Sequence, residues 1–398
     1  MKLRRVLFVG DLRPISTCLP RMRGLEALGL DVVSLDTVGW AGLSRLARFV
    51  SSQVWATPSV VRMNAALVAL AAKHRPDVVW IEKGTWVYPP VLRTLRRYAR
   101  FLVHYNTDDV FGSAGRFRLA RWGIPHFDLQ LTTNRFNVQE FRSRFSVGTL
   151  RVGMGFDPAL HRPPPPESAG LAPGAIVFLG HCEPHTEKYI LALSSAGLPV
   201  RVWGGTWDRA TTPGLRRIQP CSQDEYAPTI ARAAVALCFL SRANRNESTG
   251  RSFEIPAIGG CMLAERTPEH EYLYREGAEA VFFSDAAELV RKARYLLDHQ
   301  EERHRVARAG RARCLALDLS WGGHIAREWP LVERLLVGDR LRPGVDDAPF
   351  WPGFRAAEPF CGEPTETNDE APGTAGSEVG SIVAPPAEFV GGKRAERA

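Results

Sequence analysis

A polar loop and a short helix around residue 250 hold the residues best suited to chemistry. Arg251 and Glu254 lie three positions apart and would share one face of a helix, which Ser248 or Thr249 could cap. A helix N-terminus favours anions, so an arginine, open backbone N–H groups and a nearby carboxylate would suit a nucleotide diphosphate. The alternative is a surface ion pair between Arg251 and Glu254.

The composition is that of an ordinary globular protein, long enough for about two domains. Of its 398 residues, 45% are hydrophobic and 24% are charged. No apolar run reaches the roughly 20 residues that a membrane span needs. Asp11 and Arg13 interrupt a start that would otherwise resemble a signal peptide. We therefore expect a cytoplasmic protein without a transmembrane segment.

Charge and cysteine content argue against several classes of protein. The net charge is +8, and the last 60 residues are acidic, so the body of the chain is more basic than the whole. Its arginines are spread over many amphipathic segments rather than gathered in one block, which argues against nucleic-acid binding. The seven cysteines are scattered without a C-x-x-C pair, which indicates reduced thiols rather than disulfides or zinc.

Predicted strands and helices alternate over the first 160 residues. Strands are expected at 4–9, 31–35, 77–82, 101–105, 128–132 and 149–152. Helices are expected at 21–28, 59–74, 89–100 and 134–145, and residues 40–57 have an amphipathic helical pattern. Such alternation predicts a parallel sheet with helices on both faces. Gly10 and Asp11 follow the first strand, where a ligand crevice would lie, but a lone glycine gives little support to a classical dinucleotide site.

A second alternating series follows the proline-rich segment 162–174, which we interpret as a link between two domains. Strands are expected at 175–179, 199–203, 234–240, 261–264 and 280–283. Helices are expected at 186–196, 222–233, 285–298, 301–317 and 321–337, with shorter ones at Arg251 and Pro268. Two α/β domains would leave a cleft between them, which is a common ligand site. Residues 362–398 have few large apolar side chains and are expected to be disordered.

The segment around Arg251 resembles that of a known family. The run Arg251-Ser252-Phe253-Glu254 followed by Ala257-Ile258-Gly259-Gly260 is similar to the R-x-F-E-x-x-A-x-G core of the CgeB-like glycosyltransferases. Segments 153–163, 267–269, 277–281 and 309–311 fit the same family in order, and the pair Asp108-Asp109 resembles it too. The resemblance covers about 149–315, is thin over 1–148 and excludes the tail.

The resemblance implies a GT-B fold, in which two Rossmann-like domains with doubly wound parallel sheets face each other across the active-site cleft. On that basis we predict an acceptor domain over 1–162, a linker over 163–174 and a donor domain over 175–320. A helix over 321–338 would cross back to the first domain, and 339–398 would be a largely disordered tail. The implied activity is transfer of a hexose-type sugar from a nucleotide-diphospho sugar, used as co-substrate, to an unknown acceptor without a cofactor or metal.

Carried over residue by residue, the resemblance assigns roles around the donor. Glu254 would accept hydrogen bonds from the ribose hydroxyls, and Arg251, next to Gly250, would face the diphosphate. Lys188 would lie near the phosphates, although pairing with the adjacent Glu187 would instead make it a surface residue.

Other assigned residues lie at the ends of predicted strands. Gly180 and His181 follow the first strand of the second domain and would line the donor cleft. Gly10 and Asp11 follow the first strand of the first domain and would belong to the acceptor side.

Two catalytic outcomes stay open. An inverting enzyme needs a base for the acceptor hydroxyl, and Asp108 or Asp109 is the best candidate, although an aspartate capping a loop is the commoner role. A retaining enzyme needs no such base. Many retaining relatives carry two glutamates eight residues apart, whereas Glu247 and Glu254 are seven apart. Glu247 lies in a charged loop and is expected to be exposed.

Two other functions are also compatible with parts of the sequence. A non-catalytic GT-B-like protein could bind a nucleotide sugar or a glycan, and the altered glutamate spacing keeps that alternative open. A nicotinamide-dependent oxidoreductase would share the alternating pattern of strands and helices, but the G-x-G-x-x-G motif is missing.

Overall fold

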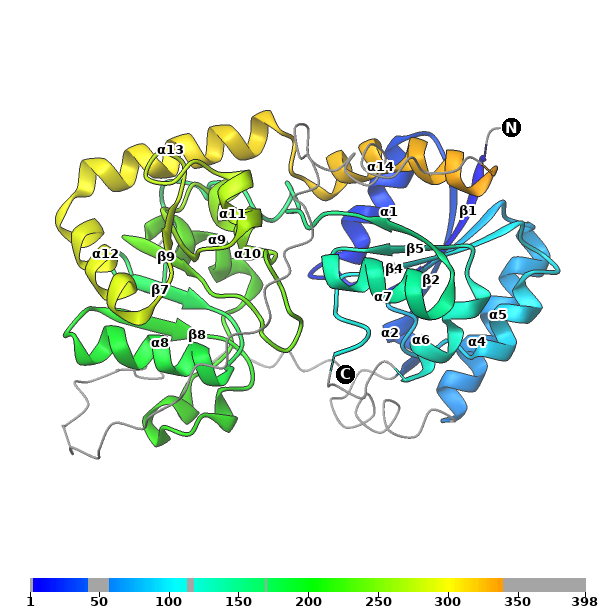
Figure 1. Cartoon of the computed structure of the whole chain (residues 1–398), viewed down its shortest axis with the longest axis horizontal. Coiled ribbons are helices and arrows are strands. Elements are labelled where there is room, and N and C mark those ends of the chain that lie inside the picture. Colours follow the sequence, from blue (N-terminus) through cyan, green and yellow to red (C-terminus); the bar gives the residue numbers. More distant parts are fainter. Residues whose placement is uncertain (1–2, 42–56, 113–117, 169, 339–398) are drawn as a thin grey trace, which may run out of the picture.

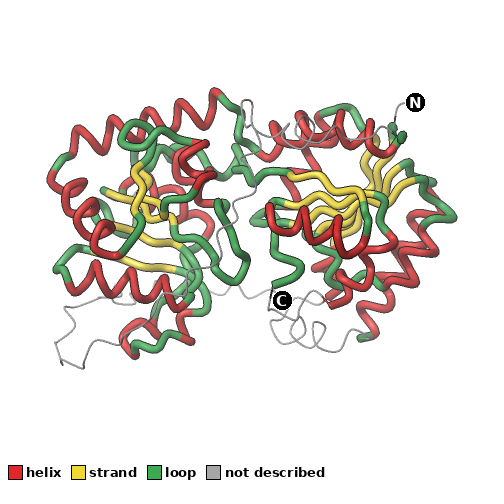
Figure 2. Tube along the Cα trace, viewed as in Figure 1, coloured by secondary structure: helices red, strands yellow, loops and turns green. Residues whose placement is uncertain are grey.

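The computed structural model describes residues 3–41, 57–112, 118–168 and 170–338. Nearly all of the amphipathic segment predicted at 40–57, and the whole predicted disordered tail, lie outside these residues. The described chain forms two α/β halves, each built on its own parallel sheet (Figure 1). Figure 2 shows each sheet enclosed between helices. The predicted fold class is therefore confirmed.

The N-terminal half is a six-stranded parallel sheet in the order β2-β1-β3-β4-β5-β6. Its strands are β1 (Arg5–Gly10), β2 (Asp31–Asp36), β3 (Val78–Glu82), β4 (Phe101–Asn106), β5 (Leu129–Thr132) and β6 (Gly148–Arg151). Its helices are α1 (Cys18–Ala27), α2 (Thr37–Ala41), α4 (Pro58–His74), α5 (Pro89–Leu95), α6 (Arg118–Gly123) and α7 (Arg135–Phe145). Asn134 caps α7, and its side chain accepts hydrogen bonds from two backbone N–H groups.

The C-terminal half is a five-stranded parallel sheet in the order β11-β10-β9-β7-β8. Its strands are β7 (Ile176–Leu179), β8 (Val200–Trp203), β9 (Val235–Cys238), β10 (Met262–Glu265) and β11 (Val281–Phe283). Its helices are α8 (Pro184–Ser195), α9 (Gln223–Arg232), α10 (Arg251–Ile258), α11 (Pro268–Leu273), α12 (Ala286–Asp298) and α13 (Gln300–Ala316). Among the described helices, none is both long and apolar enough to cross a bilayer.

The last described helix, α14 (Trp321–Leu336), returns to the N-terminal half and lies beside α1 (Figure 1). Its apolar face buries Ile325 and Trp329 in the same core as Phe8 of β1 and Trp80 of β3. At the first residue of the helix, the backbone N–H of Trp321 donates to the carbonyl of Phe156 over 3.0 Å. The chain segments around Phe156 and Ser320 therefore run side by side between the halves.

A charged pair lies inside this N-terminal core. Arg21 of α1 donates two hydrogen bonds to Glu82 at the end of β3, over 2.9 and 2.7 Å, and neither side chain is more than 1% exposed. The guanidinium also stacks on the rings of Tyr105 and Trp321, at 4.5 and 4.3 Å. One buried cation thus joins α1, β3, β4 and the start of α14.

The buried carboxyl of Glu328 in α14 should make stability depend on pH. Burial raises its pKa from 4.5 to about 8, although the Gly153 N–H and the nearby Arg21 and Arg327 oppose the shift and Glu82 adds to it. Between these values the folded state binds more protons than the unfolded state, so stability falls as pH rises through the window. Glu328→Gln should flatten this decline when thermal unfolding midpoints are measured across it. The exposed Glu301→Gln is the control, and equal slopes for the two variants would contradict the assignment.

Candidate functional site

Two cavities of about 520 Å³ each lie where the carboxyl ends of the strands meet the interdomain region. The Asp108 cavity lies between the two halves, and the Glu254 cavity lies mainly against the C-terminal half. Both include His181 and Arg251 in their walls. The main polar and aromatic residues of the Glu254 cavity are His161, His181, Trp203, Ser222, Gln223, Tyr226, Arg251 and Glu254. Those of the Asp108 cavity include Lys83, Asp108, Asp109, His181, Glu183, Arg209, Asn244 and Arg251.

The Glu254 carboxylate is held from two sides. The Tyr226 hydroxyl of α9 donates to Oε2 over 2.5 Å, and Nε2 of His161 lies 3.9 Å from Oε1. A Cβ on Gly250 would lie 2.7 Å from Oε1, so a glycine there leaves room for the carboxylate. Because Glu254 is only 16% exposed and bonds to Tyr226, the alternative of a surface pair with Arg251 is wrong.

Arg251 bridges the ends of two strands. Its Nη1 and Nη2 donate to the carbonyls of Leu179 and Phe239, over 3.3 and 2.6 Å, and the guanidinium stacks over the Phe178 ring at 5.1 Å. A Cβ on Gly180 would lie 2.9 Å from Nη1, so only glycine permits this approach. These carbonyls satisfy hydrogen bonds without neutralising the charge, which can therefore act on an anion in either cavity.

The start of α10 differs from the sequence prediction. Neither Ser248 nor Thr249 caps the helix, because the cap residue is Gly250 in helical conformation without a side-chain cap bond. The N–H groups of Ser252 and Glu254 donate to the carbonyls of Thr249 and Gly250, both over 2.9 Å. These two first-turn N–H groups are thus already used, and the Arg251 guanidinium provides positive charge at this helix start.

Gly204 follows β8 and packs against Gly180, which follows β7. Both glycines line the Glu254 cavity, so replacing Gly204 should damage that cavity. Its φ is +152°, and a Cβ would lie 1.8 Å from the carbonyl oxygen of Gly180. We expect Gly204→Ala to lower the free energy of unfolding by about 2–3 kcal/mol. The matched control is Gly205→Ala, whose Cβ would meet only the His181 ring, at 3.2 Å. Equal urea midpoints for both variants would contradict the expectation.

The two candidate bases have different surroundings. Asp109 has a fully buried side chain that pairs with Arg245 over 2.5 Å and accepts from Asn137 over 2.7 Å. Burial alone would raise the pKa of Asp109, but these hydrogen bonds lower it overall. Asp108 is 17% exposed, pairs with Lys83 over 2.9 Å and lies in the cavity wall between the halves. Both aspartates line the Asp108 cavity, but Asp109 is fully buried and tied to Arg245 and Asn137, whereas Asp108 is partly exposed.

The loop 241–249 holds the two halves together. Asn134 of the N-terminal half donates to the carbonyl of Asn244 over 2.6 Å, in addition to the Asp109–Arg245 pair. Glu247 pairs with Arg135 over 2.9 Å and is only 13% exposed. The prediction that Glu247 is solvent exposed is therefore wrong, because the loop turns it toward the opposite half.

The predicted site residues Lys188, Gly10 and Asp11 are absent from the described walls of both cavities. Lys188 is exposed on α8 and is absent from both described cavity walls, because its neighbour Glu187 faces inward and accepts from Thr211 over 2.8 Å. Gly10 is buried, and a Cβ there would meet Glu82 at 3.1 Å. Asp11 pairs with Arg13 over 2.6 Å. The structure thus leaves the predicted phosphate role of Lys188 and acceptor role of Asp11 without supporting contacts.

Sequence reasoning did not assign roles to several residues around Glu254 and Asp108. Tyr226 lies in the first part of α9, directly after the acidic residues Asp224 and Glu225 of the first turn. That position is the only signal in the sequence that could have indicated it. His161 lies within a segment that fits the family resemblance, which was a usable signal. Lys83 and Asn244 follow buried strands directly or within a few residues. A single sequence does not show that Lys83 meets Asp108 within the N-terminal half, or that Asn244 meets it from the other half.

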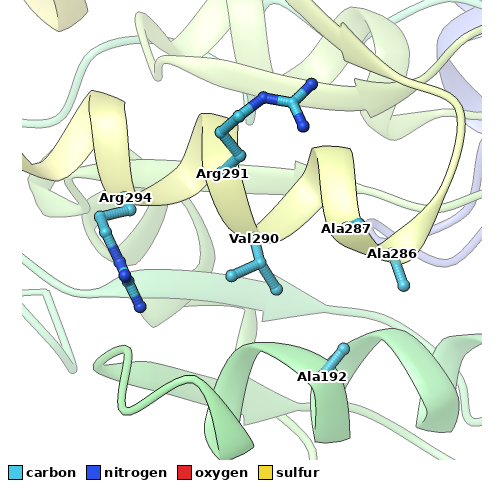
Figure 3. A pocket seen from close by; sticks show the side chains of 6 residues that line it. All are labelled: Ala192, Ala286, Ala287, Val290, Arg291 and Arg294. Carbon is cyan, nitrogen blue, oxygen red and sulfur yellow. The ribbon is translucent and has the colours of Figure 1, made fainter.

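A third cavity, of about 480 Å³, lies on the C-terminal half between α8 and α12. Figure 3 shows Ala192 on α8 opposite Ala286, Ala287 and Val290 on α12, with Arg291 and Arg294 directed away from one another. Arg294 donates to the carbonyl of Ala196 over 3.0 Å, so it braces the two helices. The described wall contains no carboxylate, and it lies apart from the strand ends that form the other two cavities.

Comparison with known proteins agrees with this geometry. A family model described as "Glycosyl transferase-like" matches residues 186–321, from α8 to the start of α14. No curated protein sequence matches the chain. Sucrose-phosphate synthase from Thermosynechococcus elongatus is similar in structure, with 12% identity and a TM-score of 0.57 over 84% of this chain and 100% of that chain.

Two further solved structures are similar at comparable distance. HepE from Anabaena, in complex with UDP and glucose, has 13% identity and a TM-score of 0.55 over 83% of this chain and 99% of that chain. A Listeria monocytogenes protein assigned as a UDP-N-acetylglucosamine 2-epimerase has 12% identity and a TM-score of 0.53 over 85% of this chain and 98% of that chain. At such low identity the likeness establishes the GT-B fold and leaves the reaction to be argued from the site.

Proposed function

We propose that this protein is a glycosyltransferase that moves a sugar from a nucleotide-diphospho sugar to an acceptor held near the N-terminal half. The observation that carries the proposal is the Glu254 cavity, where a carboxylate and an arginine that forms no ion pair among the described residues share one wall. The match to a glycosyl transferase-like family over 186–321, which includes most of that wall, supports it. So does HepE, whose similar fold holds UDP and glucose.

In this proposal the nucleotide occupies the Glu254 cavity. Glu254 accepts hydrogen bonds from ribose hydroxyls, and Trp203 with the neighbouring strand-end glycines offers an apolar wall to the base. The diphosphate lies beside Arg251 and His181, which belong to both cavities, so the sugar would extend into the Asp108 cavity. That arrangement brings the anomeric carbon between the donor half and Asp108.

Departure of the nucleoside diphosphate is the step that needs most stabilisation, because negative charge grows on the leaving oxygen. Arg251 is positioned to offset that charge, so we propose a reaction that does not require a metal. Asp108 would take the proton of the acceptor hydroxyl, and Lys83 would hold its carboxylate in place. The R-x-F-E run at Arg251 supports assignment to the CgeB-like group, with a hexose as the transferred sugar.

Thermal shift measurements test the donor site. We expect one or more of UDP-, GDP- and dTDP-sugars to stabilise the wild-type protein by about 2.7 kcal/mol at 100 times the dissociation constant, while NAD(H) has no effect. Glu254→Gln and Arg251→Ala should lose most of this shift, whereas the exposed Lys188→Ala should retain it. If no sugar nucleotide shifts the wild type, or if both site variants shift equally well, the donor-site proposal is wrong.

Product analysis then separates the reactions compatible with the fold. A transferase should hydrolyse its donor slowly when water replaces the acceptor, releasing free sugar and nucleoside diphosphate. An epimerised sugar would instead point to the reaction assigned to the Listeria monocytogenes protein. Stoichiometric binding without any product would favour the non-catalytic alternative.

A further inference from the structure

We propose that Tyr226 is a positioning residue that aims the Glu254 carboxylate at the ribose hydroxyls, and that His161 donates to the same hydroxyl, so that the site selects ribonucleotide over 2′-deoxyribonucleotide donors. The inference rests on the proposed function and adds the class of nucleotide to it. It starts from the unequal surroundings of the two carboxylate oxygens: Oε2 is bonded to Tyr226, and Oε1 lies near His161.

The Tyr226 hydroxyl fixes one end of the carboxylate. It lies 2.5 Å from Oε2, and the two groups come from adjacent helices, α9 and α10, that pack against each other. Burial, and then the negative charge of Glu254, raise the pKa of Tyr226 well above its ordinary value. The phenol therefore remains a hydrogen-bond donor at neutral pH, and Glu254 remains the acceptor.

His161 is fixed on the other side of the carboxylate. Its Nδ1 accepts the backbone N–H of Asp157 over 3.0 Å, and the backbone N–H of His161 donates to the Asp157 carbonyl over 2.7 Å. With Nδ1 used as an acceptor, the proton of the neutral ring lies on Nε2. That nitrogen is 3.9 Å from Oε1 of Glu254, too far for a direct hydrogen bond.

These contacts leave Oε1 as the oxygen directed to a ligand. Oε2 already has a short bond, while the gap between Oε1 and His161 can receive a hydroxyl that donates to the carboxylate and accepts from Nε2. The glycine at position 250 keeps this oxygen uncovered. A ribose 2′-hydroxyl has both the required donor and the required acceptor. A 2′-deoxyribose keeps only its 3′-hydroxyl, so the carboxylate and Nε2 lose one of the two hydroxyl groups that could bridge them.

The experiment compares UDP, GDP and ADP with their 2′-deoxy counterparts by calorimetry. We expect the wild type to bind its preferred ribonucleotide about 10- to 100-fold more tightly than the deoxy form, as for one hydrogen bond to a charged group. Glu254→Gln should lower this ratio, and Tyr226→Phe should lower it to a similar extent. The affinity of Tyr226→Phe for the deoxy form should stay nearly unchanged. The exposed Tyr295→Phe, which also loses one hydroxyl, should keep the wild-type ratio.

Several outcomes would overturn the inference separately from the proposed function. If Tyr226→Phe weakens both forms equally, Tyr226 has only a structural role. Equal or tighter binding of the deoxy form or of dTDP by the wild type removes the selectivity itself. His161→Ala is a second variant should Tyr226→Phe fail to fold, and an unchanged ratio there removes its role in binding the hydroxyl. If the wild type binds no nucleotide at all, the proposed function is wrong.

Discussion

Replacing Arg21 by methionine is expected to lower the free energy of unfolding by about 3–5 kcal/mol, the usual effect of breaking a buried ion pair. The substitution leaves Glu82 as a buried carboxylate with one remaining side-chain donor, the Trp80 indole N–H at 3.0 Å. It also removes the cation that stacks between Tyr105 and Trp321. Because Trp321 begins α14, the loss should loosen that helix as well as the sheet.

Urea unfolding and amide hydrogen exchange can measure this loss. Exchange should become faster in β1, β3 and α14, whereas the strands of the C-terminal half should change little. Arg23→Met is the matched control, since Arg23 lies on the same helix and is exposed. Arg21→Met combined with Glu82→Gln should recover part of the stability by removing the unpaired charge. Equal destabilisation by Arg21→Met and Arg23→Met would show that the buried pair contributes nothing.

The order of strands and helices could be read from the sequence because each buried strand is a short apolar run bounded by a turn. Most predicted strands agree with the structure to within one or two residues. The helix predicted over 89–100 ends at Leu95 in the structure. The prediction was too long because nothing in the polar run Arg96-Arg97 distinguishes a helix from a turn. The short helices α2 and α6 were missed, since one turn carries too few positions to show a period.

The candidate site was predictable only where local sequence fixes position. Gly180, His181, Arg251 and Glu254 meet because all four lie at strand ends or at a helix start on the same edge of the sheet. Lys188 was misplaced because one residue corresponds to about 100° around a helix, and the inward-facing Glu187 directs it to solvent. Contacts between distant segments depend on how helices and domains pack, so a single sequence does not show them.

The contacts of loop 241–249 give the two adjacent aspartates different surroundings. Arg245 comes from the C-terminal half, yet it pairs with both Asp109 and Glu140 of the N-terminal half. The fully buried Asp109 carboxylate is thus occupied in holding the domains together, and its lowered pKa makes it a weak base. Asp108 points to the cavity beside this contact, so the same loop that joins the halves also orders the wall where an acceptor would bind.

Replacing Asp108 by asparagine is expected to lower the rate of sugar transfer by about 10²–10⁴-fold, the usual contribution of a general base. Asparagine has nearly the same shape and can still accept from Lys83, but it cannot take a proton from the acceptor hydroxyl. Affinity for the donor nucleotide should be unchanged, because Asp108 is not part of the described wall of the Glu254 cavity. Single-turnover donor hydrolysis, with water as the acceptor, measures this rate without knowledge of the natural acceptor.

The neighbouring substitution Asp109→Asn distinguishes catalysis from domain positioning. It removes the charge that pairs with Arg245, so it should lower the urea midpoint and reduce the hydrolysis rate less than Asp108→Asn does. A retaining reaction would need no base, in which case Asp108→Asn would hydrolyse donor at nearly the wild-type rate. A rate lost only in Asp109→Asn would assign the proton transfer to the other aspartate. The two residues are adjacent in the chain but differ in burial and partner. A larger loss of rate in Asp108→Asn and a larger loss of stability in Asp109→Asn would therefore follow from the structure and not from the sequence.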